Sequence, residues 1–124
     1  MSDARCRGTL RLSKGAWLFR PDDVDLLLRV TPSPEPSPAG FLSRPVEATL
    51  SVTGRARAGS GAPGMEPRTG VPERVIGRVV DVAADAIVVD AGVPVVVMGT
   101  TGAIGETVVV DVDVDAGVGC VLVD

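Results

Sequence analysis

The sequence predicts an all-β protein, a small antiparallel barrel or sandwich of about seven to nine strands. Three observations support this prediction. Apolar and polar residues alternate with a period of two, β-branched residues dominate, and turn signals recur at intervals of about 8–12 residues. No segment carries the 3.6-residue apolar period of a helix. The 124 residues fit a single domain, residues 1–124.

The first half of the chain is predicted to form short strands. Four alternating segments indicate them: GTLRLS (8–13), AWLFR (16–20), VDLLLRV (24–30) and EATLSVTGR (47–55). Leu10 and Leu12 share one face of the first segment, and the side chains expected to face the core are Leu26, Leu28, Val30, Ala48, Leu50 and Val52. Lys14 and Gly15 are expected to form a turn between the first two strands.

Two long segments are predicted to be loops. Residues 31–45 carry a proline at every second position from Pro32 to Pro38, and proline fixes φ and removes a backbone donor. We therefore expect a stiff, extended loop outside the sheet. Residues 58–72 are rich in Gly, Pro and Ser and almost free of large apolar groups, so we expect a mobile loop there.

From residue 73 the sequence becomes valine-rich, with brief turns. Five strands are predicted: ERVIGRVVDVA (73–83), AIVVD (86–90), VPVVVMG (93–99), ETVVVDVDVD (106–115) and GCVLVD (119–124). Gly77, in the middle of the first of these strands, indicates a bulge or a bend.

This valine-rich part, residues 73–124, resembles the sheet frame of OB-fold domains, the S1-like ones especially. The resemblance rests on VIGRVVDVAADAIVVDAG, a glycine-bent strand with a hairpin, and on IGETVVVDVDVD, whose GETVVV (105–110) is similar to the fourth strand. It implies a small barrel that binds oligonucleotides across strands 2 and 3. The corresponding strands here, 86–90 and 93–99, have no aromatic and no basic residue. We therefore do not carry over the binding function.

The composition argues against most catalytic chemistry. The chain has no histidine and no tyrosine, and Lys14 is its only lysine, so the usual general base and the commonest transition-metal ligand are absent. Asp22 and Asp23 are adjacent and diverge, so they do not form an acid/base pair. The glycine-rich residues 99–106 lack the lysine of a phosphate loop. We expect no enzyme activity, no cofactor and no metal.

Asp111, Asp113 and Asp115 alternate with valines in the predicted strand 106–115, and this pattern has two interpretations. Residues two apart share a face at about 6.6–6.8 Å, so the carboxylates would line one side. An EF-hand loop needs glycine at position 6 and glutamate at position 12, whereas Gly117 falls one place late and Leu122 replaces the glutamate. A solvent-exposed strand face is therefore expected, rather than a metal site.

Five residues are the candidates for a binding surface: Trp17, Phe19, Arg11, Arg55 and Arg57. Trp17 and Phe19 share a face beside arginines, which is the composition of a single-strand binder. The alternative is that both aromatic rings belong to the core, and the low aromatic content favours it. Arg55 and Arg57, with Arg5 and Arg7, form either a phosphate-binding stripe or solvated loop charges, and the second is favoured.

The charge is divided unevenly along the chain. Residues 1–72 carry 10 basic and 7 acidic side chains, or +3, and residues 73–124 carry 2 and 9, or −7, which gives the net charge of −4. This division could favour self-association, although a solvated acidic surface is the simpler explanation.

The remaining features concern the cell compartment. The two cysteines, Cys6 and Cys120, lie near opposite ends of the chain, and a disulfide between them is one option. The polar N-terminus shows no secretion signal, and no apolar run is long enough to span a bilayer. We expect a cytoplasmic protein with free thiols.

Together these observations predict a non-catalytic interaction or assembly module. Its partner would be another protein or a second copy, bound through the edges of the sheet. Nucleic acid and membrane are not expected as partners. The main alternative is an OB-like single-stranded nucleic-acid-binding protein that uses Trp17 and the arginines. A carboxylate-based metal-dependent enzyme is a third, weaker option.

Overall fold

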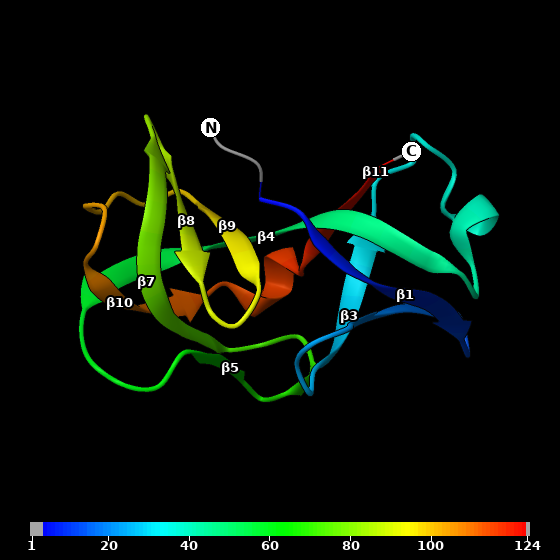
Figure 1. Ribbon diagram of the computed structural model, residues 1–124, viewed down its shortest axis with the longest axis horizontal. Coiled ribbons are helices and arrows are strands. Elements are labelled where there is room, and N and C mark those ends of the chain that lie inside the picture. Colours follow the sequence, from blue (N-terminus) through cyan, green and yellow to red (C-terminus); the bar gives the residue numbers. More distant parts are fainter. Residues whose placement is uncertain (1–3, 124) are drawn as a thin grey trace.

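The computed structural model describes residues 4–123 and shows an all-β protein (Figure 1). The strands are β1 (Cys6–Ser13), β2 (Ala16–Pro21), β3 (Leu27–Pro32), β4 (Pro45–Ala58), β5 (Gly64–Glu66), β6 (Thr69–Gly70), β7 (Arg74–Ala83), β8 (Ala86–Asp90), β9 (Pro94–Met98), β10 (Thr107–Val112) and β11 (Gly119–Val123). The 3-10 helices η1 (Pro38–Phe41) and η2 (Val114–Ala116) interrupt them. The predicted all-β class is confirmed.

Strand pairing forms two closed circuits. In the first, β1 pairs with β2, β2 with β3, β3 with β11, β11 with β4, and β4 again with β1. In the second, β7 pairs with β8, β8 with β9, β9 with β4, β4 with β10, and β10 again with β7. The sheet is mixed, because β3–β11, β4–β9 and β3–β6 are parallel. The predicted purely antiparallel sheet is therefore wrong.

The 14-residue strand β4 belongs to both circuits. Its first half pairs with β1 and β11, and its second half pairs with β9 and β10. In Figure 1 it runs across the whole molecule between the two lobes. A strand of this length spans about 46 Å at 3.3 Å per residue, which is enough to cross both circuits.

The two circuits have the same pairing order. Each runs antiparallel, antiparallel, parallel, antiparallel, antiparallel when started at β1 or at β7. In the first circuit β11 lies between β3 and β4, and in the second β4 lies at the equivalent place, between β9 and β10. Each half of the chain therefore supplies one strand to the circuit of the other half.

Glycines occupy equivalent places in β1 and β7. A β-carbon at Gly8 would meet the carbonyl oxygen of Arg20, and one at Gly77 would meet that of Asp90, at the ends of β2 and β8. Any side chain there would push the two strands apart. The bulge predicted at Gly77 is displaced along the strand, because the register of β7 against β8 shifts between Val79 and Asp81. Gly77 instead allows a close backbone approach.

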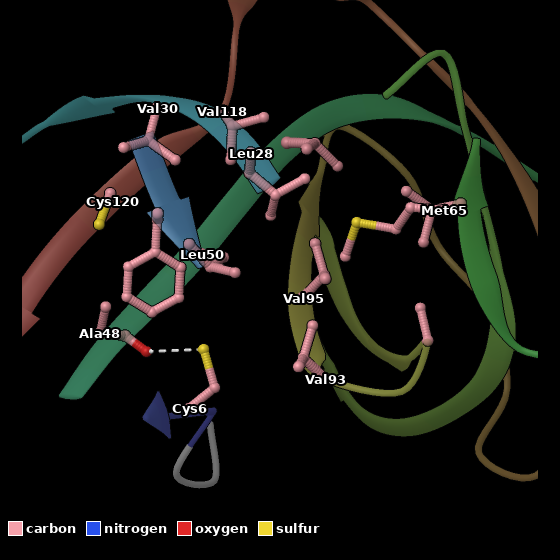
Figure 2. Close-up of a cluster of buried hydrophobic side chains, with 14 of the residues drawn as sticks. Cys6, Leu28, Val30, Ala48, Leu50, Met65, Val93, Val95, Val118 and Cys120 are labelled. Carbon is pink, nitrogen blue, oxygen red and sulfur yellow. Dashed lines mark hydrogen bonds between the residues drawn. The ribbon is translucent and has the colours of Figure 1, made fainter. Parts of the chain in front are cut away.

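One core runs through both circuits (Figure 2). The alternating residues predicted to face inward in the segments 24–30 and 47–55 are buried: Leu26, Leu28, Val30, Ala48, Leu50 and Val52. Leu10 is also fully buried, whereas Leu12, two residues further along β1, is 51 % exposed because it lies at the end of the first circuit. Leu10 and Leu12 therefore share a face of β1 but differ in burial.

Residues 58–72 do not form a loop that stays outside the sheet. Within them β5 pairs with β7 and β6 pairs with β3. Met65 is buried in the core, where Figure 2 shows it pointing toward the side chains of β9. Gly59 lies against Val109, where a β-carbon would clash, so the glycine composition permits close packing across β10.

Residues 31–45 are less uniformly extended than predicted. Thr31 and Pro32 pair with β11, and Pro38–Phe41 form η1. Pro45 already begins β4. Phe41, at the end of η1, is buried and anchors this segment to the core.

We predict that Met65→Ala lowers the free energy of unfolding by about 2–5 kcal/mol, because it leaves a cavity between β5 and the core. The matched control Met98→Ala, at a residue that is 51 % exposed, should change it by less than about 0.5 kcal/mol. Denaturant titration followed by tryptophan fluorescence gives both values. Equal effects of the two substitutions would contradict the packing of β5 on the core.

Candidate interaction surface

The two aromatic candidates point into the first circuit. Phe19 is fully buried between Leu10 of β1 and Leu28 of β3, its partners in register. Trp17 lies two residues nearer the end of the circuit, opposite Leu12 and Val30, and is partly buried against the core. The two rings therefore contribute to packing, and Phe19 is not accessible to a ligand at the surface.

The opposite, outward face of the same strands is basic. Arg11, Leu18 and Arg29 stand opposite one another on β1, β2 and β3, so their side chains share the outer face. Arg20 lies two residues along β2 from Leu18, on the same side. Lys14 sits in the β1–β2 turn, where it and Gly15 have positive φ, as a two-residue hairpin turn requires. We call this surface the basic face.

The basic face has no acidic side chain of its own. Strands β1, β2 and β3 contain no aspartate or glutamate. Within residues 4–123, Arg11, Arg20 and Arg29 make no ion pair and no side-chain hydrogen bond. All three are exposed. Their guanidinium donors are therefore available to a partner, and each guanidinium offers five.

Beside these arginines lies a depression of about 390 Å³ with a mixed polar and apolar lining. Its lining residues are Arg11, Leu12, Ser13, Leu18, Leu42 and Ser43. The segment with Leu42 is tied to β1 by a bridge to Leu10 and by a hydrogen bond from Ser43 N to the Leu10 carbonyl (3.4 Å). The depression combines exposed leucine surface with a cation at its edge, which is the composition of a protein-binding site.

The arginines Arg55 and Arg57 lie on the other half of β4 and are balanced by acid. Arg57 Nε donates to Asp111 Oδ2 of β10 at 3.1 Å, and Asp111 stands opposite both Arg55 and Arg74. Both partners of the 3.1 Å pair are more than half exposed, so it stabilises the fold by less than about 1 kcal/mol. These arginines do not join Arg11 in one surface.

A second group of arginines, Arg5, Arg7 and Arg44, lines a groove of about 370 Å³ at the start of β4. One carboxylate, Glu47, offsets part of its charge, and Arg44 lies over the Phe41 ring at 4.8 Å. Arg5 lies 3.8 Å from Glu47, and Arg7 stands opposite Glu47 on β4, while its carbonyl accepts from the backbone N–H of Asp22 (3.0 Å). The four arginines of the less favoured phosphate-binding stripe, Arg5, Arg7, Arg55 and Arg57, are thus divided between the two ends of β4.

The three aspartates 111, 113 and 115 do not share one strand face. Asp111 belongs to β10, but the strand ends at Val112. Asp113 caps η2 by accepting a hydrogen bond from the Asp115 backbone N–H (3.2 Å). All three are exposed, as predicted. The alternation breaks here because the chain leaves the second circuit and enters the first.

Asp111 is also surrounded by the guanidinium groups of β4 and β7, which oppose a metal cation. Within residues 4–123 no three His, Cys, Asp or Glu side chains are grouped so that they could hold a metal ion. In the same range, no helix is long and apolar enough to cross a membrane.

The two cysteines are free and buried. Cys6 on β1 stands opposite Ala48 on one side of β4. On the other side of β4, Leu122 of β11 stands opposite Ala48, and Cys120 lies two residues before Leu122. Two strand spacings separate the cysteine backbones by about 10 Å, beyond the roughly 7 Å limit for a disulfide. Cys6 Sγ donates instead to the Ala48 carbonyl at 3.6 Å (Figure 2).

Burial suppresses the reactivity of both thiols. It raises the pKa of Cys6 from 9.0 to about 11, with the negative charge of Asp22 adding to the effect. Burial likewise raises the pKa of Cys120 from 9.0 to about 12, with the nearby Cys6 as a second cause. The thiolate is the nucleophile, so neither thiol is poised for chemistry at neutral pH.

The sequence interpretation missed the basic face as a unit. Alternation alone places Arg20 and Arg29 outward, on the side opposite Phe19 and Leu28. The missing information was that β1, β2 and β3 are neighbours in register, which brings Arg11, Leu18 and Arg29 into one row.

Comparison with known proteins gives no relative from which a role could be inferred: no family model, no curated protein and no solved structure matches this chain. The functional argument therefore rests on the surface described above.

We predict that Cys6 and Cys120 react with a thiol reagent at pH 8 far more slowly in the folded protein than in denaturant, because the folded state disfavours the thiolate. Because both pKa values are raised on folding, the stability that the neutral thiols contribute is present below pH 9. It is lost as pH rises from about 9 to 12. Rapid labelling of either thiol in native buffer would contradict this.

Proposed function

We propose that the protein is a non-catalytic interaction module that binds an acidic and apolar protein surface through its basic face. The observation that carries this proposal is the row Arg11, Leu18 and Arg29, in which unpaired guanidinium groups flank exposed apolar surface. Arginine beside apolar side chains is enriched where proteins bind one another, and carboxylates accept from guanidinium in a bidentate fashion.

A binding role through side chains fits the way the sheet is closed. Each strand of the two circuits has a partner on both sides over part of its length, so long open edges are lacking among the described residues. Pairing of a partner strand along an edge, the mode first considered, would find only short sites such as Arg11–Ser13, beyond the β1–β4 pairing. The basic face offers a broader contact.

We further propose that each circuit is a small five-stranded barrel, with the OB-like frame as its nearest architectural type. That frame would place a ligand on its second and third strands, and in the first circuit these are β2 and β3, which carry Arg20 and Arg29. This observation favours a second candidate, the single-stranded nucleic-acid-binding function.

Two features support the protein partner over nucleic acid. Trp17 and Phe19 point to the side opposite the arginines, so no stacking platform accompanies the basic face. The net charge of −4 also opposes approach to a polyanion. A role without catalysis is supported by the lack of histidine in the sequence. We place the protein in the cytoplasm, where two reduced thiols would persist.

The test is recovery of the tagged full-length chain from the cells that express it, followed by identification of proteins that co-purify. We predict that at least one protein co-purifies with the unmodified chain and still does so after nuclease treatment. The double substitution Arg11→Glu/Arg29→Glu should abolish its recovery, because it reverses the charge at both ends of the row. The control Arg68→Glu, at an exposed arginine outside the basic face, should retain the partner.

Two results would count against this proposal. If the unmodified chain, the Arg11→Glu/Arg29→Glu variant and the Arg68→Glu control all recover the same partners equally, the basic face is not the contact. Recovery of nucleic acid that is lost on Arg11→Glu/Arg29→Glu, with no dependent protein, would replace the protein partner by the second candidate.

A further inference from the structure

We propose that the partner of the basic face is a second copy of this chain, which docks with the opposite end of its molecule, the end of the second circuit at the β7–β8 turn. This inference rests on the proposed binding role of the basic face and names its occupant. It is carried by the match between two surfaces of one chain in charge and in apolar character.

The docking end gathers most of the exposed apolar surface of the molecule. Four of the seven large hydrophobic side chains that are exposed among the described residues lie there: Val80 (46 %), Val82 (39 %), Met98 (51 %) and Ile104 (65 %). Val82 is opposite Ile87 and Met98 is opposite Ala86, at the hairpin end of β8. The Gly105 N–H donates to the Val79 carbonyl (2.8 Å), which brings Ile104 beside β7.

The charge of this end is wholly negative. No lysine or arginine follows Arg78 in the sequence, so every charged side chain of the β7–β8 turn and the 99–106 loop is acidic. Asp85 is exposed in the turn itself, and Glu106 stands next to Val79, whose N–H donates to the Glu106 carbonyl (2.9 Å). We call this surface the acidic end.

The basic face is complementary in both respects. Its three strands carry Arg11, Arg20 and Arg29 and no acid, and Leu12 and Leu18 line the depression beside Arg11. Contact would remove both apolar patches from water and bring carboxylates to unpaired guanidinium groups.

The two surfaces lie at opposite ends of the molecule. In Figure 1 the β7–β8 hairpin projects from the lobe of the second circuit, and β1 and β3 form the far lobe. They therefore cannot meet within one chain. A contact between two different surfaces is head-to-tail, so each added copy presents a fresh basic face or acidic end, and the assembly grows into a chain unless it closes into a ring.

The experiment is sedimentation velocity on the full chain at about 20 mM and about 500 mM salt, over about 10 μM to 1 mM protein. We expect the average mass to rise with concentration at low salt and to fall toward monomer at high salt, where screening weakens the charge pairing. Arg11→Glu/Arg29→Glu and Asp85→Lys/Ile104→Lys should each be monomeric throughout. Arg68→Glu should associate like the unmodified protein.

The decisive arm mixes the two double variants. The intact acidic end of the Arg11→Glu/Arg29→Glu protein can meet the intact basic face of the Asp85→Lys/Ile104→Lys protein, so the mixture should associate although neither variant associates alone. A monomeric mixture, a variant that still associates alone, or an unmodified chain that stays monomeric at about 1 mM and low salt would overturn the inference.

Failure here is distinguishable from failure of the proposed function. A chain that does not associate with itself but recovers another protein through Arg11 and Arg29 would refute the second copy as partner and leave the binding role of the basic face in place. If the chain neither associates with itself nor recovers another protein through Arg11 and Arg29, both proposals are wrong.

Discussion

The sharing of β4 between two strand circuits is the constraint on which the rest of the structure depends. Neither half of the chain holds all the strands of its own circuit: β11 completes the first, and the second half of β4 completes the second. The circuits therefore close together, around one continuous core. The break at η2 follows from the same arrangement, because there the chain leaves β10 and passes to the other circuit, with Asp113 capping the turn.

This arrangement also separates the charges of the molecule. The charged side chains on strands β1, β2 and β3 of the first circuit are all basic, and the aspartates of this part of the chain, Asp22, Asp23 and Asp25, lie in the β2–β3 connection. The hairpin β7–β8 projects from the second circuit and has an acidic turn. Because β4 runs through both circuits, the two charged surfaces are held at a fixed separation. Where Arg55, Arg57 and Asp111 meet on β4 and β10, opposite charges are paired instead and the surface is balanced.

The sequence was sufficient for features that depend on local periodicity. Alternation placed Leu28, Leu50 and Val52 correctly in the core, because a period of two is a property of a single strand. It failed where the outcome depends on distant pairing. Trp17 and Phe19 share a face, yet only Phe19 is fully buried, because it lies deeper in a circuit that β11 closes. Met65 and the row of Arg11, Leu18 and Arg29 were missed for the same reason: each acquires its role from strands far along the chain.

The exchange of strands is tested most directly by dividing the chain in the segment 58–63, which joins β4 to β5. Fragments 1–61 and 62–124 should each be unfolded alone by far-ultraviolet circular dichroism and amide proton dispersion, because each lacks a strand needed to close its circuit. Mixed in equal amounts, they should recover the spectrum of the intact protein. A fragment that folds cooperatively by itself would contradict the shared strand as the basis of the fold.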